Sequence, residues 1–167
     1  MASAPPKLLA LDTNLVLDLA QELDAAHDFR ETFKDRGYGF RLPPTAAVEL
    51  RWKSRRDPDE RIRMLATRAL VELRSWDIQP LPELGDLEFA IAERFVTRLH
   101  HARLLPDEEI NDGFILAETS LARIAALVSS DAHLLDMDET HLRLVFEESD
   151  LPWATPVHPQ RMLKAVS

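Results

Sequence analysis

Four carboxylates occupy positions that a parallel α/β fold would bring together. Asp12 directly follows the apolar run KLLAL, and Asp131 comes just after the apolar run ALVS. Both therefore stand at the carboxyl end of an expected buried strand. Glu49 and Asp112 fall in the first turns of two expected helices. Because ligands in open parallel sheets bind beyond the carboxyl ends of the strands, we expect the four side chains to meet at one edge of the sheet.

These four residues favour metal-dependent chemistry. Carboxylates gathered in a small space repel one another, so the cluster is stable only when it is protonated or holds cations. Oxygen ligands, with no cysteine in the chain and no clustered histidine, favour Mg²⁺ or Mn²⁺ over Zn²⁺. Such ions lower the pKa of a water molecule and stabilise charge on the attacking and leaving oxygens of a phosphodiester. The set therefore predicts a metal-dependent nuclease in which no side chain acts as the nucleophile.

Each acid also has a plain structural interpretation. Asp12 and Asp131 could be N-caps of the helices that follow them. Asp112 could be a first-turn acid that complements the helix dipole. Glu49 could pair with Lys53 at i+4, which would contribute only about 0.2–0.5 kcal/mol. These alternatives stay open for each residue taken singly, and the case for a site depends on their joint occurrence.

The elements that must position the acids alternate between strand and helix. We expect strands at 7–11, 39–42, 77–81, 126–129 and 155–157 from their apolar runs. Helices are expected from 13, over 21–36, from a Thr45 cap, over 57–75 and 86–104, from 107 or 111 to about 126, from 130, over 139–150, and from 159. This alternation predicts a mostly parallel sheet covered on both faces. The length of 167 residues suits one domain, 1–167.

Composition narrows the compartment and the chemistry. The chain is 46% hydrophobic and contains no cysteine, which excludes disulfides, zinc ribbons, iron–sulfur clusters and thiol nucleophiles. The apolar stretch 8–20 is interrupted by Asp12, Asn14 and Asp18, so it is neither a signal-peptide core nor a membrane span. We therefore expect a cytoplasmic protein that has no membrane partner.

The charge is unevenly distributed along the chain. The net charge is −9, yet residues 51–74 carry +4, so the remainder carries −13. A local basic patch can bind phosphates because salt screens charges beyond about 8–10 Å. Arg51, Arg55 and Arg56 are therefore candidate nucleic-acid contacts, and Trp52 beside them could stack on a base. The alternatives are a solvated helical face for the arginines and a place in or near the core for Trp52.

Several segments together resemble the PIN-domain family. They are LALDTNLVLDL around Asp12, PTAAVEL around Glu49, NDGFILAETSLARIAALVSSDAHLL spanning Asp112 to Asp131, and a final VHPQRML. The resemblance covers nearly the whole chain, in order. It implies a three-layer α/β/α sandwich with a mostly parallel central sheet and cleavage of RNA with Mg²⁺ or Mn²⁺. Asp12, Glu49, Asp112 and Asp131 match the family's acidic positions one by one, as catalytic residues and metal ligands.

The resemblance also implies supporting residues and partners. Asn14 matches a polar position that supports the first Asp, and Ser130 stands beside the last Asp, where a hydroxyl is usual. The commonest pattern in the family has that hydroxyl one residue earlier, at Ser129. Many small members of the family are toxins of bacterial toxin–antitoxin pairs, so an antitoxin protein and a homodimer are the expected partners besides RNA. The chain is slightly long for that class, which favours ribonuclease over toxin.

Other functions compete with this interpretation. An aspartyl phosphotransferase would use Asp12 as nucleophile, but it usually has a second acid two residues later, where this chain has Asn14. A dinucleotide-binding protein is disfavoured because four glycines cannot build a phosphate loop. A non-catalytic interaction module that retains the fold and the acids stays open. Glu118 and Asn111 are possible supporting residues, although Glu118 follows Asp112 by six residues and is therefore expected at the surface. His133 is expected to have a surface or packing role.

Overall fold

The strands form an all-parallel sheet. The structure is a computed structural model, and it describes residues 7–167. Within this range a five-stranded sheet has the order β3-β2-β1-β4-β5, and every neighbouring pair is parallel. The strands are β1 (Lys7–Leu11), β2 (Tyr38–Leu42), β3 (Ile78–Pro80), β4 (Ala126–Val128) and β5 (Thr155–Val157). The expected parallel sheet is therefore confirmed, and each strand lies within two residues of its predicted bounds.

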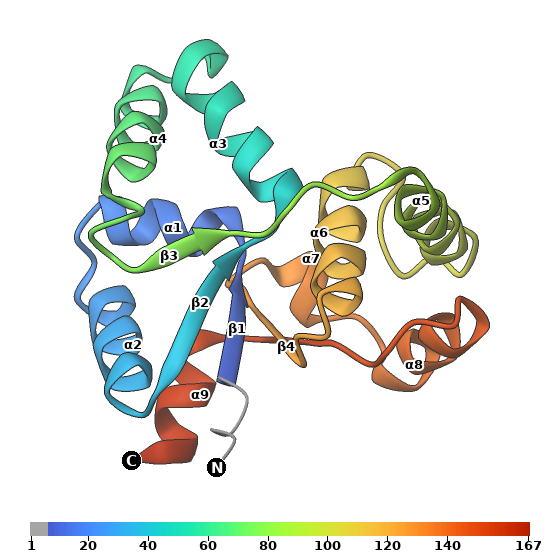
Figure 1. The fold of residues 1–167 in the computed structure, drawn as a ribbon. Helices are drawn as coiled ribbons and strands as arrows, with labels where there is room; N and C mark the ends of the chain where they lie inside the picture. Colours follow the sequence, from blue (N-terminus) through green and yellow to red (C-terminus); the bar gives the residue numbers. More distant parts are fainter. Residues whose placement is uncertain (1–6) are drawn as a thin grey trace.

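Helices flank the sheet on both sides and give an α/β/α arrangement (Figure 1). In that view α1, α2 and α4 lie to the left of the sheet and α5, α6 and α8 to the right. The helices are α1 (Thr13–Ala20), α2 (Asp24–Asp35), α3 (Pro44–Arg56), α4 (Glu60–Glu72), α5 (Asp86–His101), α6 (Ile110–Leu121), α7 (Ala132–Leu135), α8 (Glu139–Glu148) and α9 (Pro159–Val166). None of the helices described is long and apolar enough to cross a membrane.

The core lies on both faces of the central strands. In β1, Leu9, Ala10 and Leu11 are all at most 2% exposed, as expected of a strand covered on two sides. Large apolar side chains from α2, α5 and α8 complete the core, including Phe29, Phe33, Phe95 and Phe146. Burial of this kind stabilises the fold by about 1.5–3 kcal/mol per large side chain. A continuous apolar run is therefore a reliable signal of a buried strand.

The side of the sheet to which the chain adds new strands changes between β3 and β4. From β1 the chain proceeds outward to β2 and β3, and after α5 and α6 it returns to β4 on the other side of β1. The backbone continues this pairing beyond the strands, because the Asp12 amide donates to the Val128 carbonyl at 3.0 Å. The segments that follow β1 and β4 therefore leave the sheet side by side, at the place where parallel sheets bind ligands.

Helices α3 and α4 form a hairpin that rises above this edge (Figure 1). Its turn is made by Asp57 and Pro58, where the Asp57 carboxylate accepts from the Asp59 amide at 2.9 Å. Asp59 caps α4 by accepting from the Arg61 amide, so the helix spans Glu60–Glu72 and begins three residues later than the predicted 57–75. The predicted Thr45 cap of α3 is also wrong, because Pro43 holds that position and α3 begins at Pro44.

Candidate metal centre

Asp12 is held at the end of β1 by two hydrogen bonds. Its Oδ1 accepts from the Thr13 amide at 2.8 Å, which caps α1. Its Oδ2 accepts from the Ser129 hydroxyl at 2.7 Å. The side chain is 4% exposed, and burial raises the pKa of its carboxyl, an effect that Ser129 and Thr13 partly offset. Asp12 is therefore both a helix cap and a buried, oriented carboxylate.

Ser129 links Asp12 to Asp131. While its hydroxyl donates to Asp12, its Oγ also accepts from the Asp131 amide at 3.0 Å. The supporting hydroxyl is thus that of Ser129, where the commonest family pattern has it, and not that of Ser130, which we had expected. Ser130 contributes its backbone amide, which donates to Asn14 Oδ1 at 3.5 Å. Asn14 therefore connects the first turn of α1 to the segment that follows β4, and its supporting role at the site stays a prediction.

Asp131 and Asp112 face each other from α7 and α6. Asp131 caps α7 by accepting from the His133 amide at 2.8 Å. Asp112 lies in the first turn of α6 and is 7% exposed. Its neighbour Gly113 allows α6 to approach α5 closely, since a Cβ there would lie 3.0 Å from Val96 Cγ2. This close contact between α6 and α5 sets the position of Asp112 within the cluster.

Glu109 and His133 extend the cluster on its outer side. His133 Nδ1 lies 3.2 Å from Glu109 Oε1 and 3.8 Å from Asp131 Oδ1. One ligand atom from each of Glu109, Asp112, Asp131 and His133 lies within 4.8 Å of the others, an arrangement that could hold a metal ion. We expected a surface or packing role for His133. It is indeed half exposed, but its imidazole belongs to the cluster.

Glu49 reaches the cluster from α3. The Thr13 hydroxyl donates to Glu49 Oε1 at 3.3 Å. Burial, followed by the negative charge of Asp12, raises the pKa of Glu49 to about 7, while Lys53 lowers it. The Lys53 ammonium lies 3.8 Å from Asp57, so the structural alternative of a Glu49–Lys53 pair accounts for only part of the environment of Glu49.

The hydrogen bonds within the cluster do not satisfy all of its carboxylate oxygens. Burial, together with the negative charges of Asp12, Asp131 and Glu109, raises the pKa of Asp112 to about 9. Asp112 Oδ2 is buried and has no hydrogen-bond partner among the described residues. An unpaired buried carboxylate oxygen is costly, because its hydration is lost without replacement. A bound cation would satisfy this oxygen, so the donor set fits a metal ion.

Glu118 has a role that its sequence position did not suggest. It is 5% exposed on α6, and its carboxylate accepts from the Thr45 amide at 3.0 Å and from the Thr45 hydroxyl at 2.7 Å. It therefore caps the first turn of α3 from another helix. The expected surface role is wrong, and the contact ties the helix that carries Glu49 to the helix that carries Asp112.

Comparison with known proteins identifies the fold. Neither a protein-family model nor a curated protein matches the chain. The structure of VapBC2 from Rickettsia felis bound to a DNA fragment from their promoter is similar, with a TM-score of 0.61, 12% identity, and coverage of 90% of this chain and 98% of that chain. FitAcB from Neisseria gonorrhoeae is similar with a TM-score of 0.56, 15% identity, and coverage of 91% and 98%. The toxin components of these complexes are PIN-domain proteins. This chain has a PIN-like fold.

A third neighbour, FitAB bound to an IR36 DNA fragment, gives a TM-score of 0.55 at 14% identity over 90% of this chain and 94% of that chain. At these identities the likeness transfers the fold alone. Of the four predicted acids, Asp112 and Asp131 belong to the group of ligand atoms that also includes Glu109 and His133, whereas Asp12 and Glu49 do not. Asp12 and Glu49 are nevertheless near it, because the charge of Asp12 raises the pKa of both Glu49 and Asp112.

The sequence-based interpretation missed three contributors to the cluster. Ser129 could have been found, because the family pattern placed a hydroxyl there. His133 carried a signal too, since it follows Asp131 by two residues. Glu109 had no such signal, because it precedes α6 and joins the cluster only through the packing of α6 against the loop after β4. Arg51, Arg55 and Arg56 are exposed on the second half of α3, and they lie outside the hydrogen-bonded cluster.

Proposed function

We propose that this protein is a metal-dependent endoribonuclease, a phosphodiester hydrolase whose Mg²⁺ or Mn²⁺ is held by Asp12, Glu49, Asp112 and Asp131. The observation that carries the proposal is the buried Asp112 Oδ2, which has no hydrogen-bond partner and faces other carboxylates. Acids that serve only as caps would each find a local partner, as Asp12 does. The alternative of an aspartyl phosphotransferase is weaker, because Asn14 stands where that chemistry usually has a second acid.

The chain's own residues have distinct tasks in this proposal. Asp12 and Asp112 would supply buried oxygen ligands and Asp131 a partly exposed one. Ser129 orients the Asp12 carboxylate and accepts a hydrogen bond from the Asp131 backbone amide. Glu49 would add a ligand from α3. Glu109 and His133 each offer a ligand atom within 4.8 Å of those of Asp112 and Asp131, so they could complete the coordination of the ion. When bound, a divalent cation lowers the pKa of a water molecule and stabilises negative charge on the phosphodiester oxygens.

The substrate side of the proposal depends on α3. Arg51, Arg55 and Arg56 project from the helix that carries Glu49 and are exposed to solvent. Arginine binds phosphate oxygens through a planar fork of donors. These residues would hold the RNA backbone while the carboxylate cluster acts on one phosphate, so the acidic protein presents a basic surface beside its site.

The test is cleavage of a mixed RNA pool with Mg²⁺ or Mn²⁺, comparing the wild type with Asp12→Asn and with an EDTA control. The matched control is Glu147→Gln, an exposed acid on α8. We expect cutting by the wild type and by the control, and none by Asp12→Asn or with EDTA. Calorimetric titration with Mn²⁺ gives an independent readout. Metal binding without cutting would support the alternative of a non-catalytic interaction module.

A protein partner is the second part of the proposal. The similar structures include the VapBC2 and FitAcB complexes, which are toxin–antitoxin complexes. We propose that this chain is the toxin of such a pair, with an antitoxin that blocks the site, and that it forms a homodimer. Expression should then arrest growth, and Asp12→Asn should relieve the arrest. Sedimentation of the purified chain tests the dimer, and growth without arrest would favour a processing or decay enzyme.

A further inference from the structure

A hollow of about 410 Å³ opens beside the carboxylate cluster. It is lined by Val48, Glu49, Trp52 and Lys53 of α3 and by Asn111 of α6. Its volume falls within the range of about 300–1,000 Å³ that is usual for small-molecule sites. Because Glu49 forms one wall, whatever occupies the hollow lies next to the proposed metal ligands.

The lining of this hollow suits a flat aromatic ring with polar edges. Val48 is 53% exposed and Trp52 is 49% exposed, and they are four residues apart on one face of α3. Trp52 was expected in or near the core, but the structure leaves its indole half in solvent. Asn111 contributes an amide, which carries both a donor and an acceptor. An apolar face with one amide at its rim is the combination that binds a nucleobase by stacking and edge contacts.

The basic side chains on the second half of α3 favour a negatively charged occupant of the hollow over an apolar segment of a protein. After Glu49, α3 contains Arg51, Lys53, Arg55 and Arg56 and no acid before the helix ends. Of these four residues Lys53 lines the hollow, and the three arginines are exposed on the same helix. Positive charge is concentrated on this helix although the whole chain carries −9. A nucleotide offers both parts that match, a base for the indole and a phosphate for the basic side chains.

We propose that the hollow binds one unpaired base of the RNA next to the phosphate that is cleaved, with the base stacked on Trp52. This inference rests on the proposed function and adds a substrate class, single-stranded or looped RNA. A base inside a duplex is stacked between its neighbours and cannot enter the hollow, whereas an unpaired base can turn out onto an aromatic side chain.

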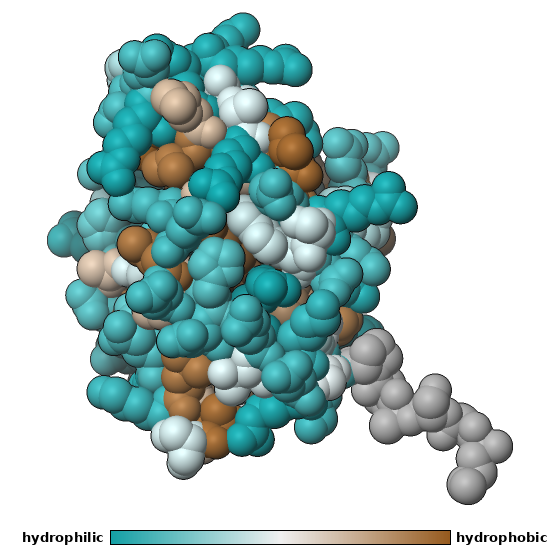
Figure 2. All heavy atoms as spheres, turned by 90° about the vertical axis from the view of Figure 1, so that its left-hand side faces the viewer, coloured by the Kyte–Doolittle hydropathy of each residue, from teal (hydrophilic) through white to brown (hydrophobic). Residues whose placement is uncertain are grey.

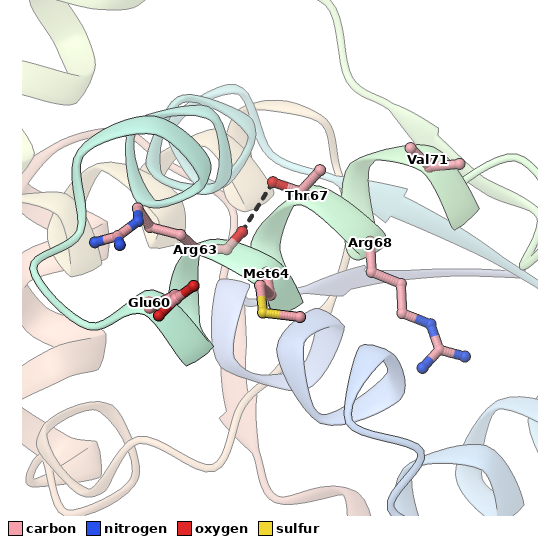
Figure 3. Close-up of a pocket in the computed structure, with 6 residues that line it drawn as sticks. All are labelled: Glu60, Arg63, Met64, Thr67, Arg68 and Val71. Carbon is pink, nitrogen blue, oxygen red and sulfur yellow. Dashed lines mark hydrogen bonds between the residues drawn. The ribbon is translucent and has the colours of Figure 1, made fainter.

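A second hollow provides a matched control. It measures about 530 Å³ on the outer face of α4 and is lined by Glu60, Arg63, Met64, Thr67, Arg68 and Val71 (Figure 3). It shares no residue with the carboxylate cluster. The surface on this side of the molecule is mostly hydrophilic, with small separate hydrophobic areas (Figure 2). Met64 is 67% exposed, so Met64→Ala removes a comparable exposed apolar side chain without touching the proposed base site.

The experiment measures binding of a short fluorescein-labelled single-stranded RNA by anisotropy, with Ca²⁺ in place of Mg²⁺ to suppress cleavage. Trp52→Ala should weaken binding by about 5- to 100-fold, the range that stacking of one base commands. Trp52→Phe should retain most of the affinity, because it keeps an aromatic face. Met64→Ala should bind like the wild type, and the corresponding duplex should bind Trp52→Ala and wild type equally.

The outcomes separate this inference from the proposed function. If the wild type binds and cleaves RNA and Trp52→Ala does so equally well, the base site is wrong and the nuclease stands. If the wild type neither binds nor cleaves RNA, both are wrong. If Trp52→Ala leaves RNA binding intact but changes the oligomeric state in sedimentation, the hollow is a protein interface and the base site is again wrong. Because Trp52 is half exposed, both variants should melt like the wild type.

Discussion

Glu49→Gln should flatten part of the pH dependence of stability in the metal-free protein. Burial and the charge of Asp12 raise the pKa of Glu49 from its ordinary value of 4.5 to about 7. The folded protein therefore keeps a proton that the unfolded chain has already released. The resulting stabilisation is fully present below pH 4.5 and is lost as pH rises through 7. Glutamine mimics the protonated carboxyl, so the variant should not lose this contribution.

The size of the effect follows from the two pKa values. One pKa unit corresponds to about 1.4 kcal/mol, so the gap between 4.5 and about 7 sets a ceiling of about 3 kcal/mol. Glu49 is only partly buried, and solvent screening reduces this to about 2 kcal/mol. At pH 8 in EDTA, Glu49→Gln should therefore be about 2 kcal/mol more stable than the wild type, and near pH 4.5 the two should be equal.

Urea denaturation in EDTA at several pH values between 4.5 and 8 measures this difference. Glu147→Gln, an exposed acid on α8, serves as the control and should follow the wild type. Added Mg²⁺ should stabilise the wild type more than Glu49→Gln at pH 8, because binding to the folded state alone stabilises it. Parallel pH curves for the wild type and Glu49→Gln, or a wild type more stable than the variant at pH 8, would refute the electrostatic account.

Three further predictions concern the residues around the cluster. Ser129→Ala should destabilise the protein by about 1–3 kcal/mol, since it leaves Asp12 and the Asp131 amide without their partner, and should weaken Mn²⁺ binding by about 10- to 100-fold in calorimetry. Glu118→Ala should lower the free energy of unfolding by about 0.5–2 kcal/mol through loss of the α3 cap, with Glu118→Gln restoring part of it in urea titrations. Charge reversal of Arg55 and Arg56 should weaken RNA binding and flatten its salt dependence, and unchanged binding by a folded double variant would reject their role.

The parallel sheet was predictable because its strands are continuous apolar runs. KLLAL buries its last three side chains, as an apolar run in a sheet covered on both faces should, and the predicted strand agrees with β1 at both ends. Helix boundaries were less predictable, since caps depend on partners elsewhere in the chain. Thr45 has the residue type of a cap, but the Glu118 carboxylate caps the helix from α6. A contact across 73 residues leaves no trace in the local sequence pattern.

The candidate site divides in the same way. Asp12 and Asp131 were predictable because strand ends in a parallel sheet converge by topology. Glu109 and His133 were not, because they reach the cluster through the first turn of α6 and the short helix α7. Trp52 is a large apolar residue of the kind usually found in or near a core, yet on α3 it is 49% exposed. Sequence patterns thus predict what topology dictates and miss what tertiary packing decides.

Asp112 distinguishes a metal site from a set of ordinary helix caps. Asp12 and Asp131 do cap α1 and α7, so their positions follow from the structural interpretation and do not by themselves distinguish it from the proposed one. Asp112 differs, because α6 begins after Glu109 without a side-chain cap and Asp112 Oδ2 is buried without a partner. A first-turn acid that only complemented a helix dipole would gain nothing from this burial, since the dipole effect is available at the surface. A cation bound to Asp112, as proposed, would account for this position, and Asp112→Asn should then stabilise the metal-free protein while weakening Mn²⁺ binding.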